Sequence, residues 1–465
     1  MTSHQTRTLV DVVNGLARCG DDVALLTFDT ADTHKPETWT FAQLHAAVRG
    51  LAAGLVCDGL RPAEPVAIVA PNSPAWVAAA LAVIAAGGVA VPVDSQLDDE
   101  TLAHILRDSG TQRTFTTRAE RDRLERVAGC ALRCHALDDG DDTTASWHTL
   151  IAPDAEPPSA GAPGETAAMF YTSGTTGPPK GVPLSHANIA YQLDTLRGMA
   201  LMTPGARLLL PLPLHHVYPF VVGLLGAMVY GVGVVMPRAL TGPEVVAAIR
   251  AGQVATVIGV PRLFNALCEG ITSRARERGP VARRAFDTML GASMAARGRL
   301  GLCIGRQLFR PVHARFGPDL RLLVSGGAAL DPETAWTLTG LGWTVTTGYG
   351  LTETAPMVSI LFPGDTHFVA NGKVVPGTEV RIAPLVDSTG TRADDAPGEI
   401  QIRGPGVFAG YHHLPERTAE AFTSDGWFRA GDRGYLDARG DLHVLGRPEP
   451  LVVTEAGVNI QIEAL

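Results

Sequence analysis

The sequence predicts an α/β protein with two doubly wound βα lobes followed by a small β lobe. From about residue 40 to about residue 370, short apolar runs alternate with helical segments, which is typical of βα units on a parallel sheet. Beyond about residue 370, alternating segments separated by Gly and Asp turn signals indicate antiparallel strands. Hydrophobic residues make up 46% of the 465 residues, so the chain can bury a large core.

The first βα lobe is expected to begin with a helix at residues 42–60. Apolar runs at 66–70 and 89–93 predict buried strands, and the segments at 74–88 and 98–110 predict the helices that follow them. A connector rich in Pro, Gly and Ala at 152–165 then separates this lobe from the next one.

The second βα lobe is expected to contain the strands RLLLPL, VGVVMP and ATVIGVP and a helix in EVVAAIRAG. The uncharged run at 208–237 is interrupted by prolines, glycines and two histidines. A membrane span requires about 20 consecutive apolar residues, so this run is interpreted as strand–helix–strand.

Residues 271–317 form a helical, arginine-rich segment with ten arginines against only Glu277 and Asp287. One interpretation is a solvated helical insertion. The other is a basic surface that contacts anionic lipid headgroups at the membrane periphery, or an acidic carrier protein.

The net charge, the cysteine pattern and the N-terminus argue against nucleic-acid binding and against secretion. The formal net charge of −9 argues against nucleic-acid binding, which requires a basic surface. The six cysteines are scattered without a CxxC pair, which favours a reducing compartment. The N-terminus shows no secretory signal, so we expect a cytoplasmic protein without a transmembrane segment.

The segment YTSGTTGPPKG at 171–181 predicts a loop that binds phosphate. Its glycines let the backbone approach an anion, and its hydroxyls and lysine add donors. The order of residues differs from that of a Walker loop, which disfavours a P-loop NTPase. Lys180 is one of only three lysines, with Lys35 and Lys373, among 38 basic residues.

This segment resembles the signature loop of the AMP-forming, adenylating enzymes, which include acyl-CoA synthetases. The segments LPLHHVYPF, LLVSGGAAL, GYGLTETAP, VPGTEVRI, GEIQIRGPGVFAGY, GWFRAGDRGYL and LGR resemble further motifs of that family and follow in its order. The resemblance implies the large N-terminal adenylating domain at 1–447, with α/β lobes to about 370 and a β-rich lobe at about 371–447.

The resemblance also implies roles for individual residues in binding ATP and Mg²⁺. Thr352 would bind the α-phosphate, and Glu353, with Thr172, would bind Mg²⁺. Asp432 would accept hydrogen bonds from the ribose, with Arg447 near the ribose or phosphate. The β- and γ-phosphates would be held by Thr172, Ser173, Gly174, Thr175, Thr176, Gly177 and Lys180. The adenine would lie between Ala328 and Tyr349, beside Gly348 and Gly350.

The acyl pocket would be bordered by His216, with His215 structural, and lined by Val260, Gly326 and Gly327. The small apolar lining offers no charged anchor for an amino acid. The helical insertion before VSGGAAL and the phrase LGWTVTTGYGLTETAP most resemble the long-chain fatty acyl-CoA synthetase branch. The reaction would be activation of a fatty acid to acyl-adenylate, followed by transfer to CoA or an acyl carrier protein. An aryl-acid ligase and a non-catalytic acyl- or nucleotide-binding interaction protein are the alternatives.

The last residues, 448–465, resemble a hinge and the beginning of the mobile C-terminal domain that relatives carry. Glu449 lies at the pivot, between two prolines, which should restrict its rotation. Three interpretations follow: a fragment of a longer protein, an enzyme specialised for adenylation and completed by another protein, or a non-catalytic binding protein.

Overall fold

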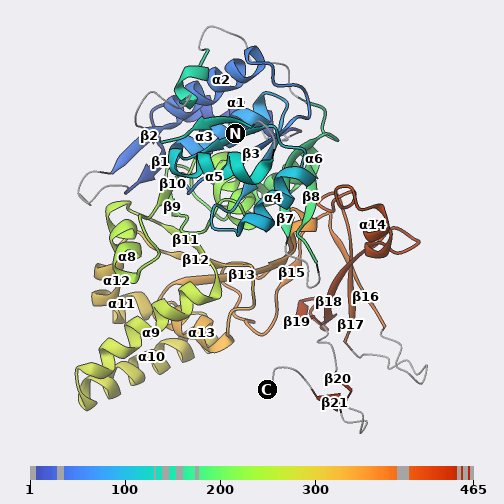
Figure 1. Cartoon of the computed structure of the whole chain (residues 1–465). Helices are drawn as coiled ribbons and strands as arrows, with labels where there is room; N and C mark the ends of the chain where they lie inside the picture. Colours follow the sequence, from blue (N-terminus) through green and yellow to red (C-terminus); the bar gives the residue numbers. More distant parts are fainter. Residues whose placement is uncertain are drawn as a thin grey trace.

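The computed structural model describes residues 7–28, 36–129, 132–138, 146–152, 161–172, 177–384, 397–447, 452–453 and 459–460. These residues form a six-stranded, a nine-stranded and a four-stranded sheet, and a separate pair of short strands, β20 (Val452–Val453) and β21 (Asn459–Ile460). Figure 1 shows the helices packed around the two larger sheets and the four-stranded sheet beside them. The predicted α/β fold class is confirmed.

The six-stranded sheet contains the first predicted lobe and, as a correction, also two strands that follow the connector at 152–165. Its neighbouring strands, in spatial order, are β6 (Arg133–Ala136), β5 (Arg113–Thr116), β3 (Pro65–Val69), β4 (Val89–Val93), β7 (Thr166–Thr172) and β8 (Lys180–Ser185). All pairs are parallel except β7 with β8. The helices of this lobe are α2 (Phe41–Cys57), α3 (Pro74–Ala85), α4 (Asp99–Asp108) and α5 (Arg118–Ala128).

Alternate residues of the central strand β3 face two different cores, as expected for a sheet covered on both faces. Val66 and Ile68 join the main core, which also contains α3 and side chains of the nine-stranded sheet. Ala67 and Val69 pack with α4 and α5 on the other face. Every residue of α3 is buried, which explains why this helix is apolar on all sides.

The nine-stranded sheet contains the second predicted lobe. Its spatial order is β15 (Lys373–Val374), β14 (Met357–Ile360), β13 (Thr344–Gly350), β12 (Leu322–Ser325), β11 (Thr256–Gly259), β9 (Arg207–Leu209), β10 (Gly233–Met236), β1 (Val23–Thr27) and β2 (Glu37–Thr40). The strands from β13 to β1 are parallel, and antiparallel strands flank them. The sequence analysis assigned no strand before about residue 40, so β1 and β2 are an addition.

The helices α6 (His186–Met199), the π-helix η3 (Tyr218–Leu225) and α7 (Gly226–Tyr230) pack in the core on one face of this sheet. The run at 208–237 is therefore strand–helix–strand, as predicted. The opposite face is covered mainly by α8 (Gly242–Ala251), α9 (Pro261–Glu277), α12 (Arg310–Phe316) and α13 (Pro332–Gly340).

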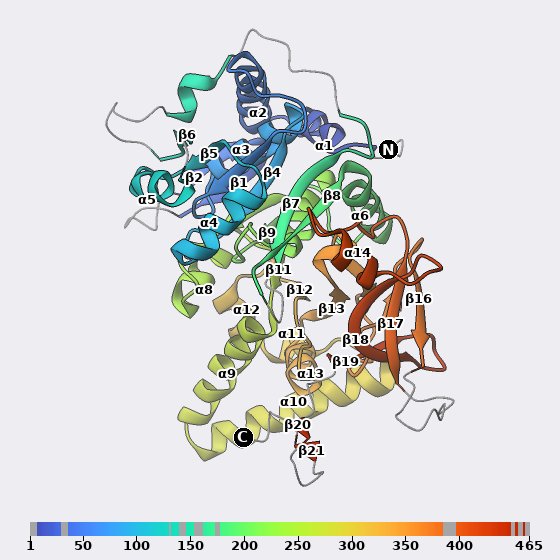
Figure 2. The ribbon, with the colours of Figure 1, turned by 45° about the vertical axis from the view of Figure 1, so that its right-hand side comes forward.

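The arginine-rich segment is helical, with α10 (Pro280–Leu300) and α11 (Gly305–Leu308) between α9 and α12. In Figures 1 and 2, α9 and α10 project away from the first lobe. Only Ser293 of α10 is buried, as a solvated helix requires. Among the described helices, none is long and apolar enough to cross a membrane.

The four-stranded sheet is antiparallel and consists of β16 (Glu379–Ala383), β17 (Gly398–Arg403), β18 (Phe428–Leu436) and β19 (Leu442–Gly446), with α14 (Pro415–Ala421) between β17 and β18. Figure 2 shows it beside β13. The remaining elements are α1 (Leu9–Leu16) and the short 3₁₀ turns η1 (Ala17–Cys19), η2 (Trp147–Leu150) and η4 (Thr352–Thr354).

Candidate functional site

The predicted site residues gather where β11, β12 and β13 end. Ligands of parallel α/β sheets bind at the carboxyl ends of the strands because the loops there meet at one edge. The loops after these three strands carry Val260, Gly326 and Thr352, respectively. The β7–β8 pair reaches the same place, with Thr172 opposite Lys180 in its register.

Two adjoining cavities at this edge are lined by every described predicted site residue except Gly177. The larger has a volume of about 850 Å³ and is lined, among others, by Thr172, Lys180, His216, Val260, Gly326, Gly327, Gly348, Tyr349, Gly350, Thr352, Glu353 and Arg447. The smaller, of about 410 Å³, adds Ala328 and Asp432 and shares Gly327, Arg447 and residues 348–351 with the larger. Because walls are shared, a ligand can extend from one cavity into the other.

The loop between β7 and β8 is described only in part. Ser173, Gly174, Thr175 and Thr176 lie outside the described residues, as does Glu449. Gly177 follows this gap with φ +104°, a conformation that L-residues with a side chain rarely adopt. Thr172 and Lys180, the residues on either side of this loop, are both described and can both donate hydrogen bonds.

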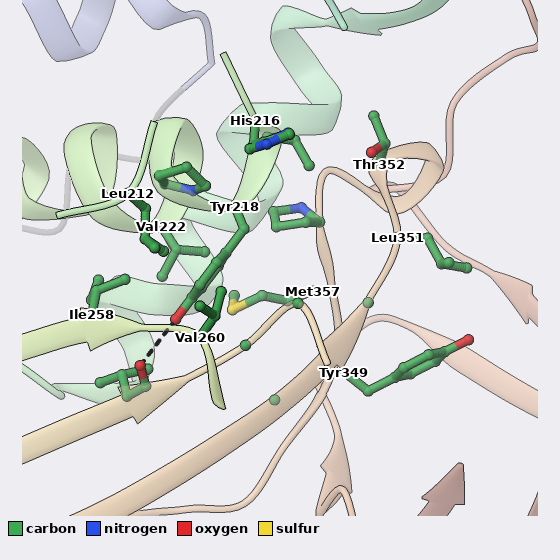
Figure 3. Close-up of a pocket in the computed structure, with 18 of the residues that line it drawn as sticks. Leu212, His216, Tyr218, Val222, Ile258, Val260, Tyr349, Leu351, Thr352 and Met357 are labelled. Carbon is green, nitrogen blue, oxygen red and sulfur yellow. Dashed lines mark hydrogen bonds between the residues drawn. The ribbon is translucent and has the colours of Figure 1, made fainter. Parts of the chain in front are cut away.

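The inner part of the larger cavity is apolar. Figure 3 shows Leu212, Val222, Ile258, Val260 and Met357 around it, while Tyr349 points away toward the smaller cavity. Leu196, Leu201 and Met202 add further apolar lining. Such a chamber favours an apolar ligand group because no charged side chain lies among these residues to pair with an ionic one.

Tyr218 spans this chamber and was not singled out by the sequence analysis, although it belongs to the quoted segment LPLHHVYPF. Its hydroxyl donates to the carbonyl oxygen of Val324 at 3.2 Å (Figure 3). Burial raises the pKa of Tyr218, so the hydroxyl stays protonated and serves as a donor. Its ring packs against Gly326, where a Cβ would lie 2.8 Å from the nearest ring atom.

His216 lies just before the π-helix η3, a helix type that is frequent at functional sites. Burial lowers the pKa of His216, which keeps the imidazole neutral at neutral pH. The adjacent His215 ring is 4.3 Å away between centroids, and its Nε2 lies 3.9 Å from Asp94 Oδ2. Burial and the neighbouring His216 lower the pKa of His215 to about 4. A neutral His216 therefore borders the cavity.

Glu353 is held by residues that the sequence analysis did not identify. The Tyr411 hydroxyl donates to Glu353 Oε1 at 2.9 Å, and Lys180 Nζ lies 5.0 Å from the centroid of the Tyr411 ring. Gln192, fully buried on α6, donates to the carbonyl oxygens of Thr354 and Met357 at 2.8 and 2.9 Å. These bonds fix the turn that carries Glu353.

The oxygen donors on this wall suit a hard divalent cation. Glu353, Thr172 and Thr352 all line the larger cavity together with Lys180. Mg²⁺ prefers carboxylate, hydroxyl and phosphate oxygens to nitrogen or sulfur donors. The residues present therefore fit a Mg²⁺ ion bound together with phosphates.

The smaller cavity is polar along one side. Tyr349 donates its hydroxyl hydrogen to Asp432 Oδ2 at 2.7 Å, and Arg447 Nε lies 3.5 Å from Asp432 Oδ1. Burial, followed by the Asp432 charge, raises the pKa of Tyr349 and keeps it a donor. Asn371 also lines this cavity and accepts from the Val444 amide at 2.9 Å. The smaller cavity therefore presents the aromatic ring of Tyr349 beside the carboxylate of Asp432.

The chain matches the sequence family described as AMP-binding enzyme over residues 14–412. It is 30% identical over 454 residues to the long-chain-fatty-acid–CoA ligase FadD15 of Mycobacterium bovis, a match that covers 90% of this chain and 71% of the relative. A feruloyl-CoA synthase of an Amycolatopsis species is also 30% identical, over 93% of this chain and 78% of the relative. The structure of ATP-bound MatB from Rhodopseudomonas palustris aligns with a TM-score of 0.76 at 25% identity, over 97% of this chain and 82% of that one.

Proposed function

The chain belongs to the AMP-binding enzyme family, and from this premise we propose that it activates a carboxylic acid with an apolar tail, in the first place a fatty acid, by transferring AMP to it from ATP. The observation that carries this proposal is the pair of adjoining cavities. An apolar chamber of the larger cavity meets Lys180, Thr352 and Glu353 at the point where the smaller, polar cavity begins.

The reaction requires one bond to form and one to break at the α-phosphorus of ATP. A carboxylate oxygen attacks this phosphorus, and the bridging oxygen to the β-phosphate leaves with the bonding electrons as pyrophosphate. Lys180 and Thr172 stabilise the charge of the leaving pyrophosphate, and Thr352 donates its hydroxyl to the α-phosphate. Glu353 and Thr172 would hold Mg²⁺, which would neutralise phosphate charge.

The remaining site residues orient the two substrates. Tyr349 and Ala328 lie on either side of the adenine, and Asp432 accepts from the ribose hydroxyls in place of the Tyr349 hydroxyl. The neutral imidazole of His216 borders the entrance to the apolar chamber. The sulfur of a thiol then attacks the acyl carbonyl carbon, and the bond to AMP breaks so that AMP leaves. The CoA-ligase relatives favour CoA as this acceptor. An acyl carrier protein docked on residues 271–317 is the alternative acceptor.

An aryl acid is the second candidate substrate because a feruloyl-CoA synthase matches as well, by identity, as the fatty-acid ligase. Exchange of labelled pyrophosphate into ATP should be measured with saturated fatty acids of graded length and with ferulate. We expect exchange that depends on the fatty acid. Faster exchange with ferulate would assign an aryl acid. If calorimetry detected ATP binding but no acid supported exchange, the chain would be assigned as a non-catalytic binding protein.

Changing Gly326 to alanine should disturb the apolar chamber through Tyr218. The new Cβ would lie 2.8–3.0 Å from three atoms of the Tyr218 ring, so the ring must move. We expect a loss of about 1–3 kcal/mol in the free energy of unfolding, the usual cost of overpacking, together with weaker fatty-acid binding. Chemical denaturation and calorimetry with the acid measure the two effects.

Gly270→Ala is the matched control, since Gly270 lies in the helix α9 and a Cβ there would meet nothing within 4 Å. This variant should keep acid binding, and its free energy of unfolding should rise by about 0.5–1 kcal/mol because alanine favours the helix. Unchanged acid binding in Gly326→Ala would show that the acid does not occupy the chamber beside Tyr218.

A further inference from the structure

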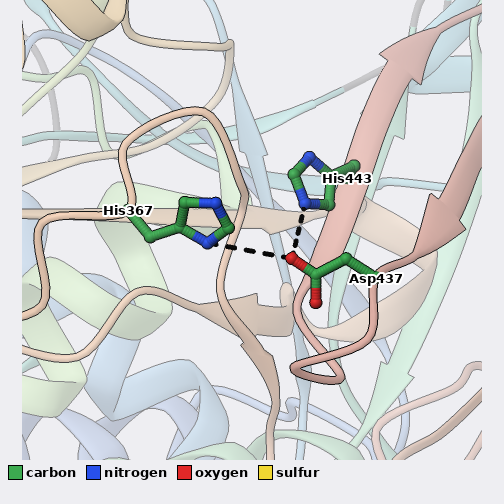
Figure 4. A group of neighbouring side chains, drawn as sticks. All are labelled: His367, Asp437 and His443. Atoms are coloured by element: carbon green, nitrogen blue, oxygen red, sulfur yellow. Dashed lines mark hydrogen bonds and ion pairs between the residues drawn. The ribbon is translucent and has the colours of Figure 1, made fainter.

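Two histidines and an aspartate form a cluster outside both cavities described above. His367 lies in the loop between β14 and β15, Asp437 directly follows β18, and His443 is in β19. One ligand atom from each lies within 4.8 Å of the others. Figure 4 shows the three side chains turned toward one another. Asp437 Oδ2 is 3.0 Å from His443 Nε2 and 3.8 Å from His367 Nδ1. The three side chains therefore converge from two separate segments of the chain.

The two separations from Asp437 Oδ2 to the histidine nitrogens suit coordination to one metal ion. Zn–N and Zn–O bonds of about 2.0–2.2 Å in a tetrahedral site place neighbouring ligand atoms roughly 3.3–3.5 Å apart. The observed separations of 3.0 and 3.8 Å lie on either side of this value. Two imidazoles and one carboxylate suit Zn²⁺, whereas Mg²⁺ and Ca²⁺ prefer oxygen donors alone.

The surrounding residues hold the Asp437 carboxylate in the orientation that a metal ligand requires. The amides of Arg439 and Asp441 both donate to Asp437 Oδ1 at 2.9 Å, so Oδ2 is the oxygen that faces the two histidines. The His443 ring stacks on Tyr435 with 4.4 Å between centroids and 7° between planes. Such supporting contacts orient metal ligands and strengthen their binding.

Of the two carboxylates at this cluster, Asp437 and Asp441, only Asp437 forms no ion pair with a Lys or Arg among the described residues. Asp441 is fully buried and pairs with Lys373 at 2.8 Å and with Arg439 at 3.4 Å. His367 Nδ1 lies 3.1 Å from Asp441 Oδ2 as well as 3.8 Å from Asp437, so two carboxylates face this one nitrogen. Lys373 and Arg439 pair with Asp441, and a metal cation bound at this nitrogen would pair with the charge of Asp437.

We propose that His367 Nδ1, Asp437 Oδ2 and His443 Nε2 bind one Zn²⁺ ion, with water in the fourth position. The ion clamps the β14–β15 loop to the β18–β19 hairpin, where the Asn371 amide already donates to the Leu442 carbonyl oxygen at 2.7 Å. Asn371 lines the smaller cavity, so the clamp restrains a wall of that cavity without contacting the reacting groups.

Zinc titration of the whole chain against a chromophoric chelator at neutral pH tests this site. The protein is first freed of metal by dialysis against a chelator. We expect one tight Zn²⁺ equivalent, which Mg²⁺ does not displace, and a higher unfolding temperature with Zn²⁺ because the ion binds only the folded cluster. Co²⁺ in the same site should give the intense visible absorption of a tetrahedral complex.

Loss of a residue that only supports a metal ligand weakens metal binding by about 10–100-fold. His443→Gln and Asp437→Asn each remove a ligand itself, so the loss of Zn²⁺ affinity should be larger. His367→Gln, in a loop, gives the same test with less risk to folding, which circular dichroism monitors. His148→Gln removes an exposed histidine elsewhere and should change nothing. Equal Zn²⁺ binding by the wild type and all three variants, or no tight equivalent at all, would overturn the proposal in favour of a cluster held by its side-chain contacts alone.

Discussion

Replacing Lys180 with alanine should slow the acid-dependent exchange of pyrophosphate into ATP by about 10²–10³-fold, the usual cost of removing one preorganised donor to developing charge. Lys180 opens β8 opposite Thr172 and lines the larger cavity with Glu353. Its ammonium group is therefore placed to contact the leaving pyrophosphate. Binding of the fatty acid should change little because the apolar chamber is formed by other side chains.

Lys180→Arg is the informative partner of this variant. The chain uses arginine almost everywhere else, and arginine keeps the charge but replaces a compact ammonium with a broad planar fork. We expect Lys180→Arg to recover part of the exchange rate. Equal losses of exchange and of acid binding in Lys180→Ala, measured by calorimetry with the acid alone, would contradict the proposed role.

The elements that the sequence predicted correctly are those whose signal is local. The strands at 66–70 and 89–93 are short apolar runs with both faces buried, so their composition alone reveals them. The site loops were recognised because each carries a contiguous motif, as in GYGLTETAP. In contrast, β1 pairs with β10, about 200 residues further along the chain, and no local pattern reports this pairing.

Residues that act through long-range contacts were missed for the same reason. Gln192 looks like an ordinary polar position in an amphipathic helix, yet it holds the turn around Glu353 from 162 residues away. Tyr411 was part of a quoted motif, but only the folded chain brings its hydroxyl to Glu353. Asp437 and His443 meet within one β hairpin, but His367 belongs to another segment, so its approach to Asp437 depends on the packing of the β lobe against β14 and β15.

Replacing Glu353 with glutamine should lower the exchange rate by about 100-fold or more, because a metal that polarises a phosphoryl oxygen contributes several kcal/mol to catalysis. Glutamine keeps an oxygen that can accept from the Tyr411 hydroxyl, so the turn should stay folded. It removes the negative charge that a hard cation needs. ATP binding in calorimetry should then lose most of its dependence on Mg²⁺.

Two further variants separate the charge of Glu353 from its position. Tyr411→Phe removes the hydrogen bond at 2.9 Å but leaves the carboxylate, so we expect a smaller loss of exchange and a retained response to Mg²⁺. Glu379→Gln changes an exposed carboxylate on β16 and should have no effect. If Glu353→Gln kept the wild-type response to Mg²⁺, another group would have to hold the ion. If Tyr411→Phe lost as much activity as Glu353→Gln, the orientation of the carboxylate would matter as much as its charge.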